Sequence, residues 1–397
     1  MDSTEFNYLN LEFIFMGDKP DAAALIRTAL ADRRLLGFIG GAVEREHSTE
    51  VMAEVATVSE ARDAVLYRID AKGKLREGSR VTKLVHELKN STGADYVLVD
   101  GDEIDGPNPD EELLGDYGTS SELLHGPKLK GSELVLAAGF ETNEITVWET
   151  GAGLMAMPKE PVYAPSIGRS NRPYLSLDRT GNVITATIEA KGPRLELFGS
   201  SMSMTVDLER TVILEPEAGS PAAVRLEELD HLLHGWDETE LELVEQLVED
   251  PAHRAEAQQL ARGSRDLKDL KRLLTLLGFD ARSVDYLTGR PLPEERRVIT
   301  TGGPYKTIKS ALAEQEREAK GLERLLYRHN WNPKALIGSG AAVLASGAAV
   351  HLVLAKSERF GWLPKPARQL LMLAWYADGA FYLGKGLVDV LKAKRSR

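Results

Sequence analysis

The chain has 397 residues, 43% of them hydrophobic, and a formal net charge of −12. This size and composition are typical of a folded protein with about two or three domains. The chain has no cysteine, which excludes disulfides, zinc–thiolate sites, iron–sulfur clusters and cysteine nucleophiles, and fits a reducing compartment. Residues 1–21 lack a basic stretch and a long apolar run, so we expect no signal peptide and a cytoplasmic N-terminal part.

The charge is unevenly distributed along the chain. Residues 356–397 contain nine Lys or Arg and three Asp or Glu, so the remaining residues carry a net charge of −18. An acidic body argues against nucleic acid as a partner. A basic C-terminal end favours contact with anionic lipid headgroups.

Residues 1–216 are predicted to form a cytoplasmic α+β domain that begins with mixed α/β structure. Apolar runs predict strands at 8–16 and 96–99, and a short strand at 35–39 that Gly40 and Gly41 stop. Apolar residues at helical spacing predict helices at 18–34 and 80–90. Residues 51–69 are apolar-rich and fit either a strand or a helix.

The second part of this domain is predicted to be a β meander. Residues rich in Val, Ile, Thr and aromatics, separated by Gly-containing turns, predict its strands. The expected strands are 133–138, 144–149, 174–177, 182–190, 194–198 and 202–214.

After a Pro- and Gly-containing linker at 216–221, the apolar spacing becomes helical. We expect a small helical domain at 222–290 with helices at 226–234, 238–249, 252–262 and 267–277. A second linker is expected at 289–303. A charged juxtamembrane helix at 304–330 follows it, on the evidence of the charge density.

Residues 335–355 form an uncharged run of 21 residues, ALIGSGAAVLASGAAVHLVLA. A helix of this length, at ~1.5 Å per residue, covers the ~30 Å of a bilayer core. The alternative is a buried helix of a soluble bundle, because Ala, Gly and Ser make up much of the run. Aromatic residues near both ends favour a membrane span with interfacial anchors. These are Tyr327, Trp331, Phe360 and Trp362.

Small residues recur every fourth position in this run, which predicts close packing against another helix, within the chain or between chains. The alternative is a helix that merely tolerates alanine. The two predicted ridges are Gly338, Ala342 and Ser346, and Ala341, Ala345 and Ala349.

Residues 368–391 form a second candidate helix, so that 335–391 is predicted to be a membrane hairpin. Asp378, Lys385 and Asp389 lie on one narrow polar stripe of this helix. It fits either a second span with the stripe facing a partner or water, or an interfacial helix in the headgroups. The Lys/Arg distribution favours a topology with both termini in the cytoplasm. The basic tail expected at the membrane surface consists of Lys392, Lys394, Arg395 and Arg397.

Few residues suggest chemistry. The acidic segment 100–116 follows a predicted strand, and Asp100, Asp102 and Asp105 offer hard oxygen ligands for a divalent cation. The alternative is a solvated acidic loop. GFIGG at 37–41 lacks the spacing of a dinucleotide loop, and no hydrolase, zinc-protease or kinase motif occurs. We therefore expect no other cofactor.

The sequence predicts an α+β protein tied to a membrane by its C-terminal hairpin. We expect it to self-associate through that hairpin and to bind an unknown protein or small molecule with its soluble region. A bacterial-defence type effector or toxin, whose hairpin oligomerises to breach the bilayer on a signal, is the first alternative. An enzyme of unknown reaction, tethered to the membrane, is the second.

Overall fold

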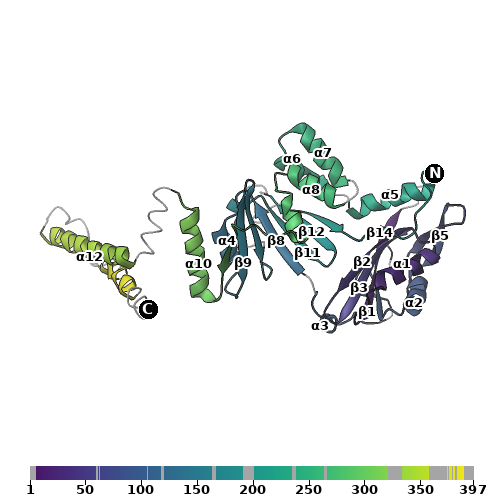
Figure 1. The fold of residues 1–397 in the computed structure, drawn as a ribbon, viewed down its shortest axis with the longest axis horizontal. Coiled ribbons are helices and arrows are strands. Elements are labelled where there is room, and N and C mark those ends of the chain that lie inside the picture. The colour runs from purple at the N-terminus through teal and green to yellow at the C-terminus, as the bar shows by residue number, and fades with distance from the viewer. Residues whose placement is uncertain are drawn as a thin grey trace. The chain divides into compact units, whose positions relative to one another are not determined.

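The computed structural model describes most of the chain. The described residues are 6–59, 61, 63–104, 106–117, 120–162, 167–190, 201–234, 238–262, 266–320, 333–356, 373, 375–377, 379–380 and 382–388. The chain divides into two compact units, Met1–Thr307 and Ile308–Arg397, and each is considered by itself. The protein is α+β, with two sheets and several helices (Figure 1).

The first unit begins with an antiparallel eight-stranded sheet. The central strand order is β2-β3-β1-β6; the first helix connects β1 to β2, and the second leads into β6. This is the split β-α-β arrangement, in which each crossover passes over one strand. Its elements are β1 (Asn7–Met16), α1 (Ala22–Asp32), β2 (Gly37–Glu44), β3 (Ser48–Thr57), β4 (Val65–Ile69), β5 (Leu75–Arg80), α2 (Val81–Thr92), β6 (Tyr96–Val99), β7 (Asp102–Glu103) and β14 (Thr211–Val212).

Both helices cover the same face of this sheet (Figure 1). Leu9, Leu11 and Phe13 are alternate residues of β1, so they point to one face and pack with Ile26 of α1 and Leu84 of α2. The residues between them on β1 point to the opposite face. That face is free of α1 and α2, and it carries the candidate site.

The second sheet of the first unit is antiparallel and has seven strands in the order β13-β12-β11-β8-β10-β9-β15. Four helices bury one of its faces, where Leu175 and Leu177 of β11 pack with Leu243 and Leu270. The elements are β8 (Ser120–Gly126), β9 (Glu144–Thr150), β10 (Gly153–Pro158), β11 (Tyr174–Thr180), β12 (Val183–Glu189), β13 (Ser201–Asp207), β15 (Arg297–Thr300), α6 (Glu238–Leu247), α7 (Pro251–Arg262), α8 (Leu267–Leu276) and α9 (Arg282–Leu287).

Three further α-helices of the first unit are shorter or peripheral. They are α3 (Glu111–Leu114), α4 (Gly131–Ala137) and α5 (Pro221–His234). Leu226 and Leu229 of α5 are buried with Phe38 of β2 and Ala56 of β3, on the face of the first sheet opposite α1 and α2.

Several predicted elements are wrong in kind or extent. The strand predicted at 133–138 is helix α4, because only Val135 of this segment is β-branched and Leu and Ala favour a helix. The strand predicted to stop at Gly40 continues through both glycines to Glu44, with a register shift between Ile39 and Ala42. Glycine tolerates such a bulge without ending a strand. The linker predicted at 289–303 contains strand β15.

Other predictions are confirmed. Strands occur at Asn7–Met16 and Tyr96–Val99, and helix α2 spans Val81–Thr92. The ambiguous segment 51–69 contains most of strand β3, which ends at Thr57, and all of strand β4. Helices α5 to α8 lie close to the four helices predicted after residue 220, and α9 is an additional helix. The strand predicted at 194–198 lies outside the described residues.

The second unit contains a pair of packed helical segments. Helix α12 (Pro333–Lys356) lies against the described helical residues between 373 and 388. The contact is close at Gly340, where an added Cβ atom would lie 2.5 Å from the backbone nitrogen of Leu383. Trp375 Nε1 donates a hydrogen bond to Ser346 Oγ at 3.3 Å.

Helix α10 (Gly303–Glu318) occupies the first part of the predicted juxtamembrane helix, and residues 321–332 lie outside the described part. Among the helices that the structure describes, none combines the length and the apolar character needed to cross a membrane.

Candidate functional site

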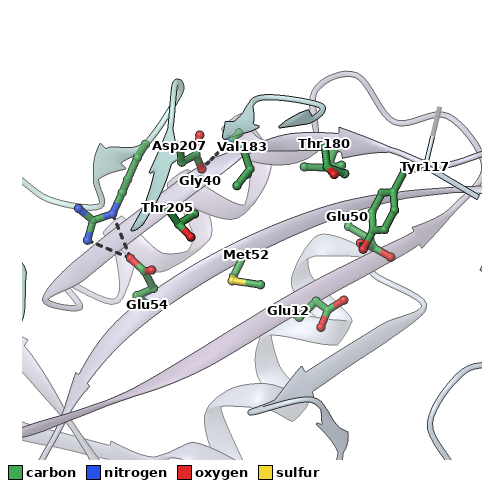
Figure 2. Close-up of a pocket in the computed structure, with 13 residues that line it drawn as sticks. Glu12, Gly40, Glu50, Met52, Glu54, Tyr117, Thr180, Val183, Thr205 and Asp207 are labelled. Atoms are coloured by element: carbon green, nitrogen blue, oxygen red, sulfur yellow. Dashed lines mark hydrogen bonds and ion pairs between the residues drawn. The ribbon is translucent and has the colours of Figure 1, made fainter. Parts of the chain in front are cut away.

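A cavity of about 430 Å³ lies on the face of the first sheet that α1 and α2 leave free (Figure 2). Its floor comes from β1 and β3. Glu50, Met52 and Glu54 are alternate residues of β3 and therefore share a face. Glu12 of β1 pairs in register with Met52, so these two side chains lie side by side in the middle of the floor.

The wall of the cavity comes from the second sheet and from the β2 bulge, all within the first unit. Thr180, Val183, Thr205 and Asp207 line the side contributed by β11, β12 and β13 (Figure 2). Asp207 Oδ2 accepts a hydrogen bond from the Gly41 backbone N–H at 3.2 Å. This close approach requires glycines, because a Cβ atom at the adjacent residue 40 would lie 2.3 Å from Asp207 Oδ2.

An arginine is held at each end of the floor. At one end, Arg45 Nε lies 3.0 Å from Glu50 Oε1 and Arg45 Nη1 lies 3.0 Å from Glu111 Oε2. The guanidinium stacks on the Tyr117 ring, 4.2 Å from its centroid. Two carboxylates and an aromatic face surround this cation and offset its charge, although Arg45 Nε and Glu50 Oε1 do not meet in hydrogen-bond geometry.

Arg210 repeats the arrangement at the other end. Its Nη2 lies 3.0 Å from Glu54 Oε2, and its Nη1 donates a hydrogen bond to Asp230 Oδ1 at 2.5 Å. The guanidinium lies 3.6 Å from the centroid of the Phe38 ring. The Arg45 and Arg210 side chains are only 8% and 17% exposed, so both ion pairs are largely removed from water.

Glu12 lies between these two ends and makes no hydrogen bond or ion pair with any residue that the structure describes. Burial raises the pKa of its carboxyl group, and the nearby Arg45 opposes that rise only in part. Burial is also the largest cause of the raised pKa values of Glu50, Glu54 and Asp207. Four carboxyl groups therefore line the cavity, together with Arg210, while Arg45 lies beside Glu50 at its edge.

The acidic loop predicted to bind a divalent cation does not gather ligands in the described residues. Asp100 and Asp102 are exposed, and Asp105 lies outside the described residues. Asp100 Oδ1 accepts hydrogen bonds from the backbone N–H and the side-chain Nδ2 of Asn10, at 2.9 and 3.3 Å. Within the described ranges, no group of three His, Cys, Asp or Glu side chains is arranged to hold a metal ion.

The predicted small-residue ridges lie on the exposed side of α12. Gly338, Ala341, Ala342, Ala345, Ser346 and Ala349 are all exposed, whereas Gly340 and Gly347 are buried against the other helical segment. Only Ser346 of the two ridges contacts that segment by a hydrogen bond that the structure describes.

Of the predicted polar stripe, Lys385 is half-buried, and Asp378 and Asp389 lie outside the described residues. The predicted interface residues also lie outside them. They are Tyr327, Trp331, Phe360, Trp362, Lys392, Lys394, Arg395 and Arg397.

The cavity was not predicted from the sequence, although one signal for it is present. Glu12 interrupts the apolar run 11–16 of β1, and Glu50 and Glu54 recur at the strand period around Met52. A functional assignment of the cavity rests on its geometry, because the chain matches no protein-family model, no curated protein and no solved structure.

Proposed function

We propose that this is a membrane-tethered, self-associating protein whose first unit binds a small cationic ligand in the cavity on the first sheet. The uncompensated carboxylate of Glu12, set between two compensated arginines, is the observation that supports this most. A half-buried carboxylate without a partner favours a cation, since pairing offsets the cost of removing its charge from water.

The rest of the lining favours a ligand that carries an apolar arm beside its charge. Met52 is 50% exposed on the floor, and Val43 and Val183 also line the cavity. The volume of about 430 Å³ lies within the range of small-molecule sites. A ligand whose ammonium group pairs with Glu12 and whose apolar arm packs on Met52 would match both the charge and the apolar lining of the cavity.

Calorimetry on the full-length protein in detergent tests the ligand class. The probes are tyramine, agmatine and cadaverine, with tyrosol as the uncharged counterpart of tyramine. We expect at least one amine to bind and tyrosol to bind at least about tenfold more weakly than tyramine, as for the loss of a charge-assisted hydrogen bond. Failure of all three amines to bind, or equal affinities for tyramine and tyrosol, contradicts the proposal.

A matched pair of variants tests the role of Glu12. Glu12→Gln keeps the side-chain shape and removes the charge, so we expect amine affinity to fall at least about tenfold. Glu245→Gln makes the same change at an exposed position of α6 and is expected to leave the affinity unchanged.

The proposed tether is the hairpin 335–391 with its basic tail, which suits anionic headgroups. Support comes from the uncharged run and from the exposed small-residue side of α12, which leaves a surface for a second copy of the chain. Removing residues 331–397 is expected to shift the protein from the membrane pellet to the supernatant. Full-length protein that remains in the supernatant after ultracentrifugation contradicts the tether.

A further inference from the structure

The face of the second sheet that α6 to α9 leave uncovered contains two directly opposed carboxyl groups. Glu122 of β8 and Asp178 of β11 are partners in the antiparallel register. Like charges at directly opposed positions destabilise a strand pair. Glu122 is also buried, at 5% exposure, so its charge is poorly screened by water.

A single hydroxyl lies between the two carboxyl groups. Ser176 Oγ is 3.4 Å from Glu122 Oε1 and 3.2 Å from Asp178 Oδ2. A serine hydroxyl has one proton, so it donates to only one of these oxygens at a time. The second Glu122 oxygen, Oε2, accepts a hydrogen bond from the Val162 backbone N–H at 2.8 Å.

The surroundings offer no compensating cation in the described part of the chain. Burial and Asp178 raise the pKa of Glu122, and the hydrogen bonds from the Val162 N–H and Ser176 lower it. Tyr174 is the other titratable group of β11 that faces Glu122. Arg172, which lies near Tyr174, pairs with Glu189 of β12 at 3.6 Å.

We propose that Glu122 and Asp178 share one proton through Ser176, so that this end of the β8–β11 pairing responds to pH near neutrality. With the proton present, the Glu122 carboxyl donates to Ser176 Oγ, and Ser176 donates to the Asp178 carboxylate. When the proton leaves to solvent, two negative charges oppose each other, and Ser176 donates a hydrogen bond to only one of them.

The Glu122–Asp178 pair lies close to the candidate site, so its titration can affect residues that line the cavity. Asp178 and Glu122 pair two residues from Thr180 and Ser120, where β11 and β8 pair for the last time. Thr180 lines the cavity on the first sheet. Weaker pairing of β8 and β11 at this end therefore affects Thr180 in the wall of the candidate site.

The sign of the pH dependence follows from the direction of the pKa shift. Burial, with a smaller contribution from Asp178, raises the pKa of Glu122 to about 7. The folded state then holds a proton that the unfolded state releases near pH 4.5. The stabilisation by this proton is complete below the unfolded-state pKa of 4.5. It is lost as the pH rises through the folded-state pKa of about 7.

Carboxyl-carbon NMR of the full-length protein in detergent measures the titration directly and needs no destabilising variant. We expect the Glu122 signal to titrate near pH 7, with the Asp178 signal moving in the same range. In Asp178→Asn the Glu122 midpoint should fall by more than about half a pH unit, because the opposing charge is gone. A wild-type midpoint in the ordinary carboxyl range, or an unchanged midpoint in Asp178→Asn, overturns the proposal.

Thermal unfolding supplies a second readout. The Tm of the wild type relative to Glu122→Gln should fall as the pH is raised from about 5 to about 8, because only the wild type loses the shared proton. Glu149→Gln, an exposed glutamate of the same sheet, should keep a constant difference from the wild type. If the Tm difference between the wild type and Glu122→Gln is also constant over this pH range, the proposal of a shared proton is contradicted.

Discussion

His125 is a completely buried side chain that joins the second sheet to the segment before α9. Its Nδ1 lies 3.0 Å from the Leu154 carbonyl oxygen, and its Nε2 accepts a hydrogen bond from the Asp280 backbone N–H at 3.0 Å. Both contacts are satisfied by the neutral ring with the proton on Nδ1. Burial lowers the pKa of His125, in keeping with this neutral form.

We predict that His125 makes the fold less stable in acid. The folded pKa lies below the unfolded value of 6.5, so its contribution is complete above pH 6.5 and is lost as the pH falls through the folded value. Protonation would also place a donor against the Asp280 N–H. Urea unfolding from pH 7.5 to 5 should show a smaller loss of stability in His125→Gln than in the wild type.

His47 provides the control for this prediction, because its side chain is 53% exposed. His47→Gln should reproduce the wild-type pH dependence. If His125→Gln also reproduces it, the neutral buried ring is not the source of acid sensitivity.

Arg210 is predicted to contribute strongly to stability. Removing it leaves Glu54 and Asp230 without their shared cation, and Glu54 is already disfavoured as an anion by burial. Breaking a largely buried pair from one side costs about 3 kcal/mol, so Arg210→Ala should lower the free energy of unfolding by roughly that amount.

The matched substitution is Arg272→Ala, which removes an ion pair with Glu256 on the surface of the helical layer. Its side chain is 48% exposed, and we expect no loss of stability beyond the measurement error in urea unfolding. Equal losses for the two variants would contradict the burial argument.

At the scale of elements, prediction from the sequence succeeded where the apolar period was regular. α2 and β1 show clear helical and strand spacing, and both were predicted within a few residues. β8 (Ser120–Gly126) was missed because its sequence SSELLHG has no β-branched residue, and its place in the middle of the sheet depends on β10 and β11. Such tertiary pairing is not readable from local preference.

The candidate site was likewise not predictable from local sequence, because distant segments form it. The floor residues come from β1 and β3, and the wall comes from β11 to β13, more than a hundred residues later in the chain. The sequence shows glutamates at alternate positions of one strand, but not which segment closes over them. The predicted acidic loop, by contrast, is a local charge run, and its described aspartates are exposed.

Helix α12 allows a paired test of its two sides. Gly340 is buried against Leu383, whereas an added Cβ at Gly338 would meet nothing within 4 Å. Gly340→Leu should therefore disturb the packing of the hairpin itself. Gly338→Leu should leave the hairpin packed and weaken self-association, because leucine blocks close approach of a second backbone.

The two effects are separated by measuring both quantities in detergent. Trp375 fluorescence, read in a variant that keeps only this tryptophan, reports on hairpin packing near Ser346. Light scattering after gel filtration gives the oligomeric state. An unchanged oligomer in Gly338→Leu would mean that the exposed side of α12 is not an association surface.

At the scale of the whole molecule, the two units contribute different parts of the proposed function. Met1–Thr307 contains the cavity and both sheets, and Ile308–Arg397 contains the hairpin proposed to tether and associate. Composition and charge favour such a division of roles, because the body of the chain is acidic and its C-terminal end is basic and weakly apolar. The proposed ligand class depends on the cavity residues of β1, β3 and β13, which the sequence alone does not bring together.

Methyl NMR of the full-length protein with ¹³C-labelled methionine tests the central claim, that a cation binds beside Glu12. The chain has eight methionines, and Met52 pairs directly with Glu12 on the cavity floor. Addition of tyramine should shift the Met52 methyl signal, assigned with Met52→Leu, and leave the buried Met204 unmoved. The shift should disappear in Glu12→Gln. A Met52 signal that does not respond, or that responds equally to tyramine and tyrosol, would contradict the claim.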